Sequence, residues 1–362
     1  MEKLSLNKEE LQKKVEVNYR CLYKKNDDDV FSTIQVLATK NKLVFMSNNE
    51  SGIIKSYLPI QRDGENIEIS VNGSNLFSAV KSLKSESAEL IFDKEKMVVK
   101  GGRRKFELKH KSTSNIYKGE EPTLEKVDVD NFIRIIENSG FCLSTDKMTP
   151  ILQCVWFGSD KTMAGDGWRY VTMNIKTPIR NMAISAKMLS EMLTILKSYE
   201  DAKPELKYSQ SADQKHAVFR IGDDYYFSVN LLEERYPKHM ADNFSDYKNK
   251  IVCNTQDFLD VVQNFSSILD ENYKVLNIEI GDKVKMYINT ASCNGEDEID
   301  VISKEEITST SIKCNYRFML DALQQIKGKE NFTMEISDDK KVCNIKTDDA
   351  DFVHPICLMT SS

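Results

Sequence analysis

The chain has 362 residues and carries 56 acidic against 50 basic side chains, a formal net charge of −6. This balance excludes a protein that binds nucleic acid by net charge alone, because neutralising phosphates requires a local excess of lysine and arginine. No run approaches the ~18 consecutive apolar residues of a membrane span, and the N-terminus lacks the apolar core of a signal peptide. We therefore expect a soluble cytoplasmic protein with no membrane partner.

Two helices and a strand meander are predicted in the first part of the chain. Asn7 is a capping residue with apolar residues at i+4 and i+8, Leu11 and Val15, which lie on one face of a helix. A second amphipathic pattern covers Leu76–Lys84 and ends in a lysine in the last turns. Alternating segments separated by turn residues then predict three antiparallel strands, Glu89–Phe92, Met97–Val99 and Lys105–Leu108.

The same order of patterns occurs three times. The first helix pattern recurs after Asp128 and after Asn254, and the second recurs at Leu189–Lys197 and Met319–Lys327. Strand-rich segments follow each second helix, at Glu205–Leu232 and Phe332–Leu358, and Val284–Ile288 adds an alternating strand between helices. The repeat predicts an α+β chain of three domains, each with two helices packed on antiparallel sheet, at residues 1–121, 122–245 and 246–362. Linkers are expected around Tyr117–Pro122 and Ala241–Lys250.

No catalytic or metal-binding pattern accompanies this repeat. The eight cysteines form no CxxC pair and mostly have apolar neighbours, so we expect reduced core thiols, no disulfide and no zinc site. The four histidines lie far apart, and no GxSxG, HExxH or P-loop occurs. Gly165-Asp-Gly-Trp168 can be interpreted as a phosphate-gripping turn, although two glycines around Asp more often make a tight turn. We expect a protein without enzymatic activity or cofactor.

Four segments resemble the bacterial DNA polymerase III β subunit, or sliding clamp. Thr149–Leu152 and Gly165–Tyr170 are similar to that family's Arg-Pro-hydrophobic-Leu and Thr-Asp-Gly-His/Ser-Arg-Leu signatures. Glu234–Pro237 is similar to its Gly-Arg-Phe/Tyr-Pro segment, and Phe352–Ile356 to its C-terminal hydrophobic-Pro-hydrophobic strand. Together with the triplicate order and the domain lengths, the resemblance covers essentially the whole chain.

The resemblance implies a head-to-tail homodimer, a ring whose helices line a hole for double-stranded DNA and which tethers the replicative polymerase as a processivity factor. The partners implied are duplex DNA bound without sequence specificity, a second copy of the chain, and DNA polymerase, clamp loader and repair proteins that dock through short peptide motifs. The basic side chains that would face DNA are Lys13, Lys14, Arg20, Lys24, Lys81, Lys84, Lys187, Lys197, Arg317 and Lys327. Each of them can also be interpreted as part of a solvated helix face, and a lysine near a helix C-terminus is favoured by the helix dipole.

Two further sites are implied by the resemblance. At the dimer interface, the edge strand Lys105–Leu108 would pair with an edge of the partner's third domain, and its Phe106 and Leu108 would pack on the partner's Ile268 and the partner's Leu269. The peptide cleft would be lined by Leu152, Gly165, Gly167, Trp168, Arg169, Tyr170, Pro237, Phe318, Val342, Val353, His354, Pro355 and Ile356. The alternative is that these residues belong to the cores of their own domains.

Departures from the family pattern lie in the expected cleft. Gly165 stands where the family usually has Thr, Thr149 where it has Arg, Trp168 where it has a smaller or polar residue, and Cys357 where it has Arg. They predict a divergent clamp with an altered peptide preference. The third predicted domain is poor in basic residues on its first helix, with Asp257 and Asp260, so a clamp-derived scaffold that binds proteins without encircling DNA is the alternative function.

Overall fold

The computed structural model describes residues 2–22, 30–93, 95–111, 123–199, 203–232, 247–269, 272–307, 309–348 and 351–359, and Lys24 and Pro237 lie outside these residues. The chain forms two compact units, each described by itself. Unit 1 comprises Met1–Ile133 and Lys187–Glu233, and unit 2 comprises Arg134–Ala186 and Glu234–Ser362. The domain boundaries predicted at residues 121 and 245 fall outside the described residues, so they stay predictions.

Unit 1 contains two antiparallel sheets. The eight-stranded sheet has the order β5-β2-β3-β4-β16-β15-β14-β9, and the four-stranded sheet has the order β1-β6-β7-β8. The bounds are β1 Glu2–Asn7, β2 Thr33–Ala38, β3 Lys42–Asn49, β4 Gly52–Pro59, β5 Ile67–Asn72, β6 Ser87–Phe92, β7 Lys96–Gly101, β8 Arg104–Lys109, β9 Glu125–Val127, β14 Leu206–Gln210, β15 His216–Ile221 and β16 Tyr225–Asn230. Strands β6, β7 and β8 confirm the predicted meander, and β14 to β16 confirm its second copy.

The pairing of β4 with β16 joins segments that are far apart in the sequence. The register runs from Tyr225 opposite Ser56 to Val229 opposite Gly52. Gly52 has a φ of +143°, and a Cβ there would overlap the carbonyl group of Ser228, so the close approach of the two strands depends on glycine. One continuous sheet therefore contains strands from both ends of unit 1.

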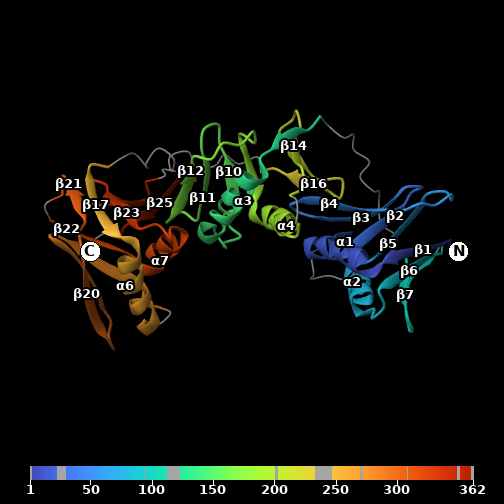
Figure 1. Ribbon diagram of the computed structural model, residues 1–362, viewed down its shortest axis with the longest axis horizontal. Helices are drawn as coiled ribbons and strands as arrows, with labels where there is room; N and C mark the ends of the chain where they lie inside the picture. Colours follow the sequence, from blue (N-terminus) through green and yellow to red (C-terminus); the bar gives the residue numbers. More distant parts are fainter. Residues whose placement is uncertain are drawn as a thin grey trace. The chain divides into compact units, whose positions relative to one another are not determined.

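The first helix of unit 1 begins where its predicted capping residue places it. Asn7 precedes α1 (Lys8–Cys21), and its Oδ1 accepts hydrogen bonds from the backbone N–H of Glu9 at 2.9 Å and of Glu10 at 3.1 Å. The other helices are α2 (Gly73–Ser82), α3 (Val129–Glu137), which crosses the division between the units, and α4 (Ala186–Lys197), with a 3₁₀ turn, η1, at Val30–Ser32. Figure 1 shows α1 and α2 adjacent.

The second helix differs from the prediction at its end. It was expected to include Lys84, but α2 ends at Ser82, and the N–H of Leu83 bonds to the carbonyl of Val80. Leu76, Val80 and Leu83 are all buried and lie in one apolar core with residues of α1 and of both sheets. The apolar spacing therefore predicted burial correctly, although Leu83 and Lys84 lie beyond the end of the helix.

Unit 2 repeats the same plan. Its nine-stranded sheet has the order β13-β10-β11-β12-β25-β24-β23-β17-β21, and its four-stranded sheet has the order β20-β19-β18-β22. The bounds are β10 Cys154–Phe157, β11 Thr162–Gly165, β12 Tyr170–Met173, β13 Met182–Ser185, β17 Asn249–Asn254, β18 Val275–Ile280, β19 Lys283–Asn289, β20 Asn294–Asp300, β21 Ser303–Glu305, β22 Thr310–Asn315, β23 Asn331–Ile336, β24 Val342–Lys346 and β25 Phe352–Cys357. The predicted strand at Val284–Ile288 lies within β19.

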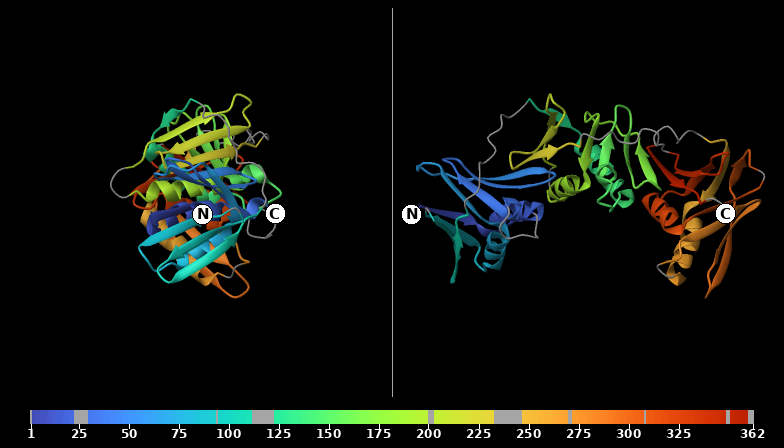
Figure 2. Two further views of the ribbon diagram at one scale, coloured as in Figure 1. Left: turned by 90° about the vertical axis from the view of Figure 1, so that its right-hand side faces the viewer. Right: turned by 180° about the vertical axis from the view of Figure 1, so that it is seen from behind.

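Two helices pack on the sheets of unit 2. Asn254 caps α6 (Thr255–Ile268) and Asn315 caps α7 (Tyr316–Gln325), each through its side-chain oxygen. The two helices lie side by side in Figure 2, and Phe258 of α6 meets Phe332 of β23 edge to face in the core. Short 3₁₀ turns, η2 (Gly140–Cys142) and η3 (Pro150–Gln153), precede β10. Mixed helices and antiparallel sheets confirm the α+β class.

Candidate functional site

The turn between β11 and β12 is fixed by one aspartate. Asp166 Oδ1 accepts hydrogen bonds from the backbone N–H of Trp168 at 2.9 Å and of Arg169 at 3.1 Å. Gly167 lies in this turn with a φ of +100°, a conformation that side-chain-bearing residues rarely adopt. The GDGW sequence therefore makes a tight turn, and the amides of Trp168 and Arg169 are bonded to Asp166 rather than available to a phosphate.

Arg169 joins this turn to α7. Its guanidinium forms ion pairs with Asp166, at 3.2 Å, and with Asp321 of α7. The guanidinium carbon also lies 4.7 Å from the ring centroid of Phe318 and 5.7 Å from that of Phe141. Arg169, predicted to line the peptide cleft, therefore holds a charged and aromatic junction within unit 2.

The C-terminal strand β25 lies directly beside β12 and its turn. Thr172 pairs with Val353, Arg169 bridges to Ile356, and the N–H of Cys357 donates to the carbonyl of Trp168 at 2.8 Å. Strand β24 pairs with β25 in turn, with Val342 opposite Cys357 and Asn344 opposite Pro355. The structure thus brings together most of the predicted cleft residues from three separate segments of the chain.

Leu152 completes this surface from η3. Its Cδ1 lies 3.8 Å from the point where a Cβ on Gly167 would sit, and its carbonyl accepts the N–H of Ser144 at 2.9 Å. Two large apolar side chains next to these segments are exposed. They are Trp168, which follows Gly167 and is 66% exposed, and Met148, which precedes Thr149–Leu152 and is 86% exposed. Met148 was not predicted. Its neighbours in Thr149–Leu152 were the sequence signal for this segment.

Tyr170 and His354 lie inside unit 2 rather than at its surface. Tyr170 is 3% exposed and His354 is 1% exposed. The centroid of the His354 ring lies 5.7 Å from that of Phe141 and 6.5 Å from that of Phe352, and neither of its nitrogens has a hydrogen-bond partner in the described structure. Burial lowers the pKa of His354 to about 4, so the ring is neutral at physiological pH.

Most cations predicted to face DNA are exposed. They are Lys13, Lys81, Lys84, Lys187, Lys197, Arg317 and Lys327. Arg20 is half-buried, and its guanidinium pairs with Glu191 of α4 at 2.9 Å and with Glu16 at 3.5 Å. Lys13 pairs with Glu9 at 3.0 Å. Internal carboxylates therefore already neutralise part of the basic cluster that the sequence places on α1.

The structure differs from the prediction at Lys14, which is 7% exposed. Its ammonium lies 3.9 Å above the ring of Tyr225 and 3.2 Å from Asp224, which also accepts a hydrogen bond from the Tyr199 hydroxyl at 3.1 Å. Burial lowers the pKa of Lys14, while Asp224 opposes that shift. Lys14 stabilises the junction of α1 with β16 and is left out of the DNA-facing set.

The position of Lys14 on the helix was the signal for its burial. It lies three residues after Leu11 and one before Val15, on the apolar face of α1. The basic cluster in the sequence includes both Lys13 and Lys14, although the two side chains lie on different faces of the helix. Its partner Asp224 is more than two hundred residues away, where no sequence pattern connects the two.

The four predicted interface residues have different environments. Leu108 is buried and Phe106 half-buried against the core of unit 1, and Leu269 packs on the core of unit 2. Ile268, the last residue of α6, is 53% exposed. Of the four, Ile268 thus presents the largest uncovered apolar side chain.

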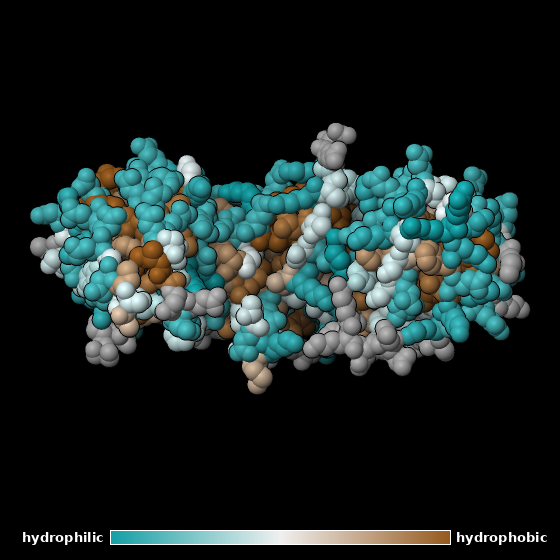
Figure 3. All heavy atoms as spheres, turned by 90° about the horizontal axis from the view of Figure 1, so that it is seen from below, coloured by the Kyte–Doolittle hydropathy of each residue, from teal (hydrophilic) through white to brown (hydrophobic). Residues whose placement is uncertain are grey.

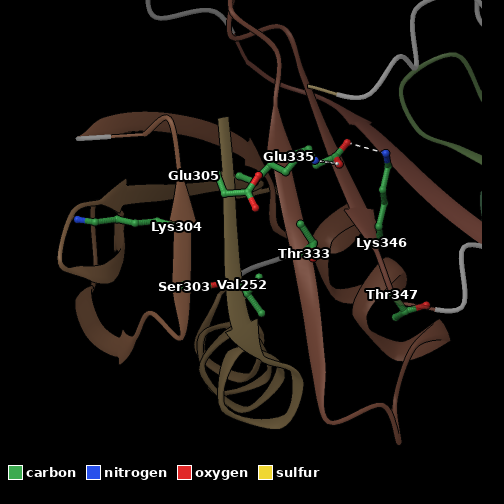
Figure 4. Close-up of a pocket in the computed structure, with 9 residues that line it drawn as sticks. Val252, Ser303, Lys304, Glu305, Thr333, Glu335, Lys346 and Thr347 are labelled. Atoms are coloured by element: carbon green, nitrogen blue, oxygen red, sulfur yellow. Dashed lines mark ion pairs between the residues drawn. The ribbon is translucent and has the colours of Figure 1, made fainter. Parts of the chain in front are cut away.

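A polar pocket of about 220 Å³ lies on the nine-stranded sheet of unit 2 (Figure 4). Glu335, buried at its floor, pairs with Lys346 at 2.6 Å and with Lys250 at 3.7 Å. The carboxylate is therefore neutralised internally. None of the predicted site residues lines this pocket.

Figure 3 shows hydrophilic side chains over most of the visible face, with hydrophobic side chains in separate patches. All eight cysteines are free thiols. Within the described residues, no group of three His, Cys, Asp or Glu side chains is placed to hold a metal ion, and no helix has the length and apolarity needed to cross a bilayer.

The helices pack on antiparallel sheets, and the strand pairs β4–β16 and β12–β25 join segments that are far apart in the sequence. This arrangement defines a clamp-type fold. Comparison with known proteins agrees. Residues 2–117 match the family model of the DNA polymerase III beta subunit, N-terminal domain, and residues 245–361 match that of its C-terminal domain. The chain belongs to the family of DNA polymerase III beta subunits, the sliding clamps.

Individual relatives are distant in sequence and close in fold. The beta sliding clamp of Bacillus subtilis is 23% identical over 356 residues, covering 91% of both chains. The crystal structure of the B. subtilis clamp superposes with a TM-score of 0.87 at 19% identity, covering 99% of each chain. The Pseudomonas aeruginosa β subunit gives 0.86 at 17% identity, covering 99% of this chain and 100% of that one.

Proposed function

We propose that this sliding clamp assembles with a second copy into a closed head-to-tail ring, encircles duplex DNA in the cytoplasm and tethers a DNA polymerase. Family membership supports the processivity function and argues against catalysis. The ring, the DNA-facing surface and the peptide site are proposals that draw on the geometry of the two units. The observation that carries the ring is a pair of edge strands with opposite charge.

Strand β8 is an edge of its four-stranded sheet, and β20 is an edge of the corresponding sheet in unit 2. Arg104, the first residue of β8, and Arg103, just before it, are exposed, and neither has a carboxylate partner among the described residues. Strand β20 has the sequence NGEDEID and is exposed along most of its length. Its Glu296 and Glu298 pair with lysines of the adjacent β19, whereas Asp297 has no cation partner among the described residues. A basic edge and an acidic edge at different places on one chain can pair between two copies, and opposite charge selects that register over like-with-like pairing.

Charge reversal tests the ring. Arg103→Glu with Arg104→Glu is expected to weaken the dimer, and Asp297→Lys with Glu298→Lys to weaken it similarly, because each places like charges on the paired edges. The four changes together are expected to restore dimerisation. Light scattering over a dilution series measures each. A wild-type chain near 41.5 kDa at every concentration would overturn the homodimer.

The DNA-facing surface is assigned to exposed cations without internal carboxylate partners. Lys81 and Lys84 satisfy this among the described residues, whereas Lys13 and Arg20 are paired. We expect Lys81→Glu with Lys84→Glu to weaken binding to a short labelled duplex more than Lys13→Glu does. Exposed Lys161, in a loop of unit 2, provides a control whose reversal is expected to change little. An equal loss of duplex binding in all variants would show that the net charge of the chain alone determines binding.

The peptide site is assigned to the surface of Leu152, Gly167 and Trp168, with Phe318 and Val342 beside it, and Ile356, which was predicted to line it, is fully buried. It is proposed to dock short motifs of polymerases, the clamp loader and repair proteins through apolar anchors. Because Trp168 replaces a smaller or polar residue, we expect weaker binding of the standard bacterial clamp-binding peptide than the B. subtilis clamp shows. Trp168→Ser is expected to strengthen it. Equal affinities of the two clamps in isothermal titration would contradict the altered preference.

The scaffold alternative is favoured by one observation. Helix α6 contains Asp257 and Asp260 and has no lysine or arginine. A protein-binding scaffold would lose no function when Lys81 and Lys84 are reversed, so the duplex-binding measurement separates the two functions.

A further inference from the structure

An aromatic stack joins α1 to α2 in unit 1. The rings of Tyr19 and Phe77 are nearly parallel, at an interplanar angle of 11°, with their centroids 4.4 Å apart. Both side chains are half-buried and pack against the apolar core of the unit. Each ring contacts both the apolar core and the other ring. The two rings therefore have little freedom to move.

A lysine lies over this stack. The ammonium of Lys81, in the last turn of α2, is 5.4 Å from the centroid of the Phe77 ring. Lys81 is exposed, and among the residues that the structure describes it has no carboxylate partner. The neighbouring cations on α1 differ, because Lys13 pairs with Glu9 and Arg20 pairs with Glu16 and Glu191. Lys81 is thus held in place by a ring that does not neutralise it.

This arrangement suits contact with a phosphate. A lysine side chain is flexible, and ordering it on binding costs conformational entropy. A ring face attracts the ammonium and restricts its positions, while the rest of the ammonium still has donors for an anion. A carboxylate partner would also restrict it, but would compete with the phosphate. Pre-ordering by a ring retains the full charge.

We propose that Tyr19 and Phe77 are positioning residues that hold Lys81 for contact with a phosphodiester of the encircled duplex. This inference rests on the proposed function, since it takes the α1–α2 face to be the side that meets DNA. Phe77 contacts no phosphate itself, and Tyr19 acts by fixing the Phe77 ring.

Binding of a short fluorescein-labelled duplex, measured by anisotropy over a salt series, tests the proposal. Lys81→Ala is expected to weaken binding and to reduce the salt dependence by about one phosphate contact. Phe77→Leu retains an apolar side chain but removes the ring, and is expected to weaken binding about two- to fivefold. Phe77→Tyr retains the ring and is expected to bind like the wild type. Tyr19→Leu supplies a second variant should Phe77→Leu not fold, as its melting temperature will show.

A double-mutant cycle distinguishes positioning from a general effect on folding. If Phe77 acts through Lys81, Phe77→Leu has no further effect once Lys81 is alanine. Lys42 and Tyr57 provide the matched control. The ammonium of Lys42, on β3, lies at the same 5.4 Å from the centroid of the Tyr57 ring, on β4. Tyr57→Leu is expected to leave DNA binding unchanged.

The outcomes separate the inference from the function on which it rests. Weaker binding by Lys81→Ala together with wild-type binding by Phe77→Leu overturns the positioning role and leaves the DNA-facing surface intact. Additive losses in the cycle also overturn it. Unchanged binding by Lys81→Ala overturns the assignment of this face to DNA, and the positioning role with it.

Discussion

Replacing Arg169 with methionine is expected to lower the free energy of unfolding of unit 2 by about 2 to 4 kcal/mol. The guanidinium compensates two carboxylates, Asp166 and Asp321, and lies against the rings of Phe141 and Phe318. Methionine fills part of the space but leaves both aspartates without their cation. Breaking a fully buried pair costs about 3 to 5 kcal/mol. Since the Asp321 side chain is 33% exposed, water recovers some of that loss.

Hydrogen exchange of the β11–β12 turn and of α7 measures this effect locally, because the whole chain need not unfold in one step. Arg169→Lys retains the charge but loses the planar group that meets two carboxylates and two rings, so an intermediate loss is expected. Arg317, an exposed arginine on α7, is the control. Arg317→Met is expected to change the free energy of unfolding by less than about 0.5 kcal/mol. Equal protection in the Arg169 and Arg317 variants would contradict the structural role of Arg169.

The structure brings together segments that were predicted to form a peptide site, and it gives neighbouring residues of that site different environments. Sequence reasoning grouped Arg169 with Trp168 because both belong to one short motif. The structure separates them, with Trp168 exposed and Arg169 bound to Asp321. Asp321 is 152 residues further along the chain, and no spacing or periodicity links residues that meet only in the folded unit. Local signals therefore identified the segment but not the partner.

Signals carried by neighbouring residues were the reliable ones. Asn7, Asp128 and Asn254 each precede a helix, and their side-chain oxygens bond to the first backbone amides as capping requires. Lys14 shows the limit of that reasoning, because its helix was predicted correctly but its partner Asp224 lies in a turn far along the chain, just before β16. The edge-to-edge joins of β4 with β16 and of β12 with β25 were not predicted, since register between distant strands is set by packing.

Gly165 and Tyr170 show how two departures from the family pattern depend on each other. Gly165 is buried and opposes Tyr170 across the β11–β12 pair. A Cβ on Gly165 would overlap Cδ1 and Cε1 of the Tyr170 ring, in the position where the family usually carries threonine opposite leucine. The ring of Tyr170 thus occupies the volume that a side chain at residue 165 would need, and the glycine accommodates the tyrosine.

Gly165→Ala is therefore expected to destabilise unit 2 by about 1 to 3 kcal/mol through overpacking. In a chain that also carries Tyr170→Leu, the same change is expected to cost less, because the ring overlap is gone. Some loss remains, since the new Cβ would still lie 2.7 Å from the carbonyl oxygen of Arg169. Gly140 is the control. A Cβ there meets nothing within 4 Å, so Gly140→Ala is expected to be nearly neutral.

Denaturant unfolding of the wild type, Gly165→Ala, Tyr170→Leu and the double variant measures the coupling between residues 165 and 170. A cost of Gly165→Ala that is the same with tyrosine or leucine at residue 170 would mean that the Arg169 carbonyl alone enforces the glycine. A smaller cost with leucine would mean that the tyrosine and the glycine were exchanged as a pair. In that case the changed interior beneath Leu152 and Gly167, and not Trp168 alone, would distinguish the proposed peptide site from the family pattern.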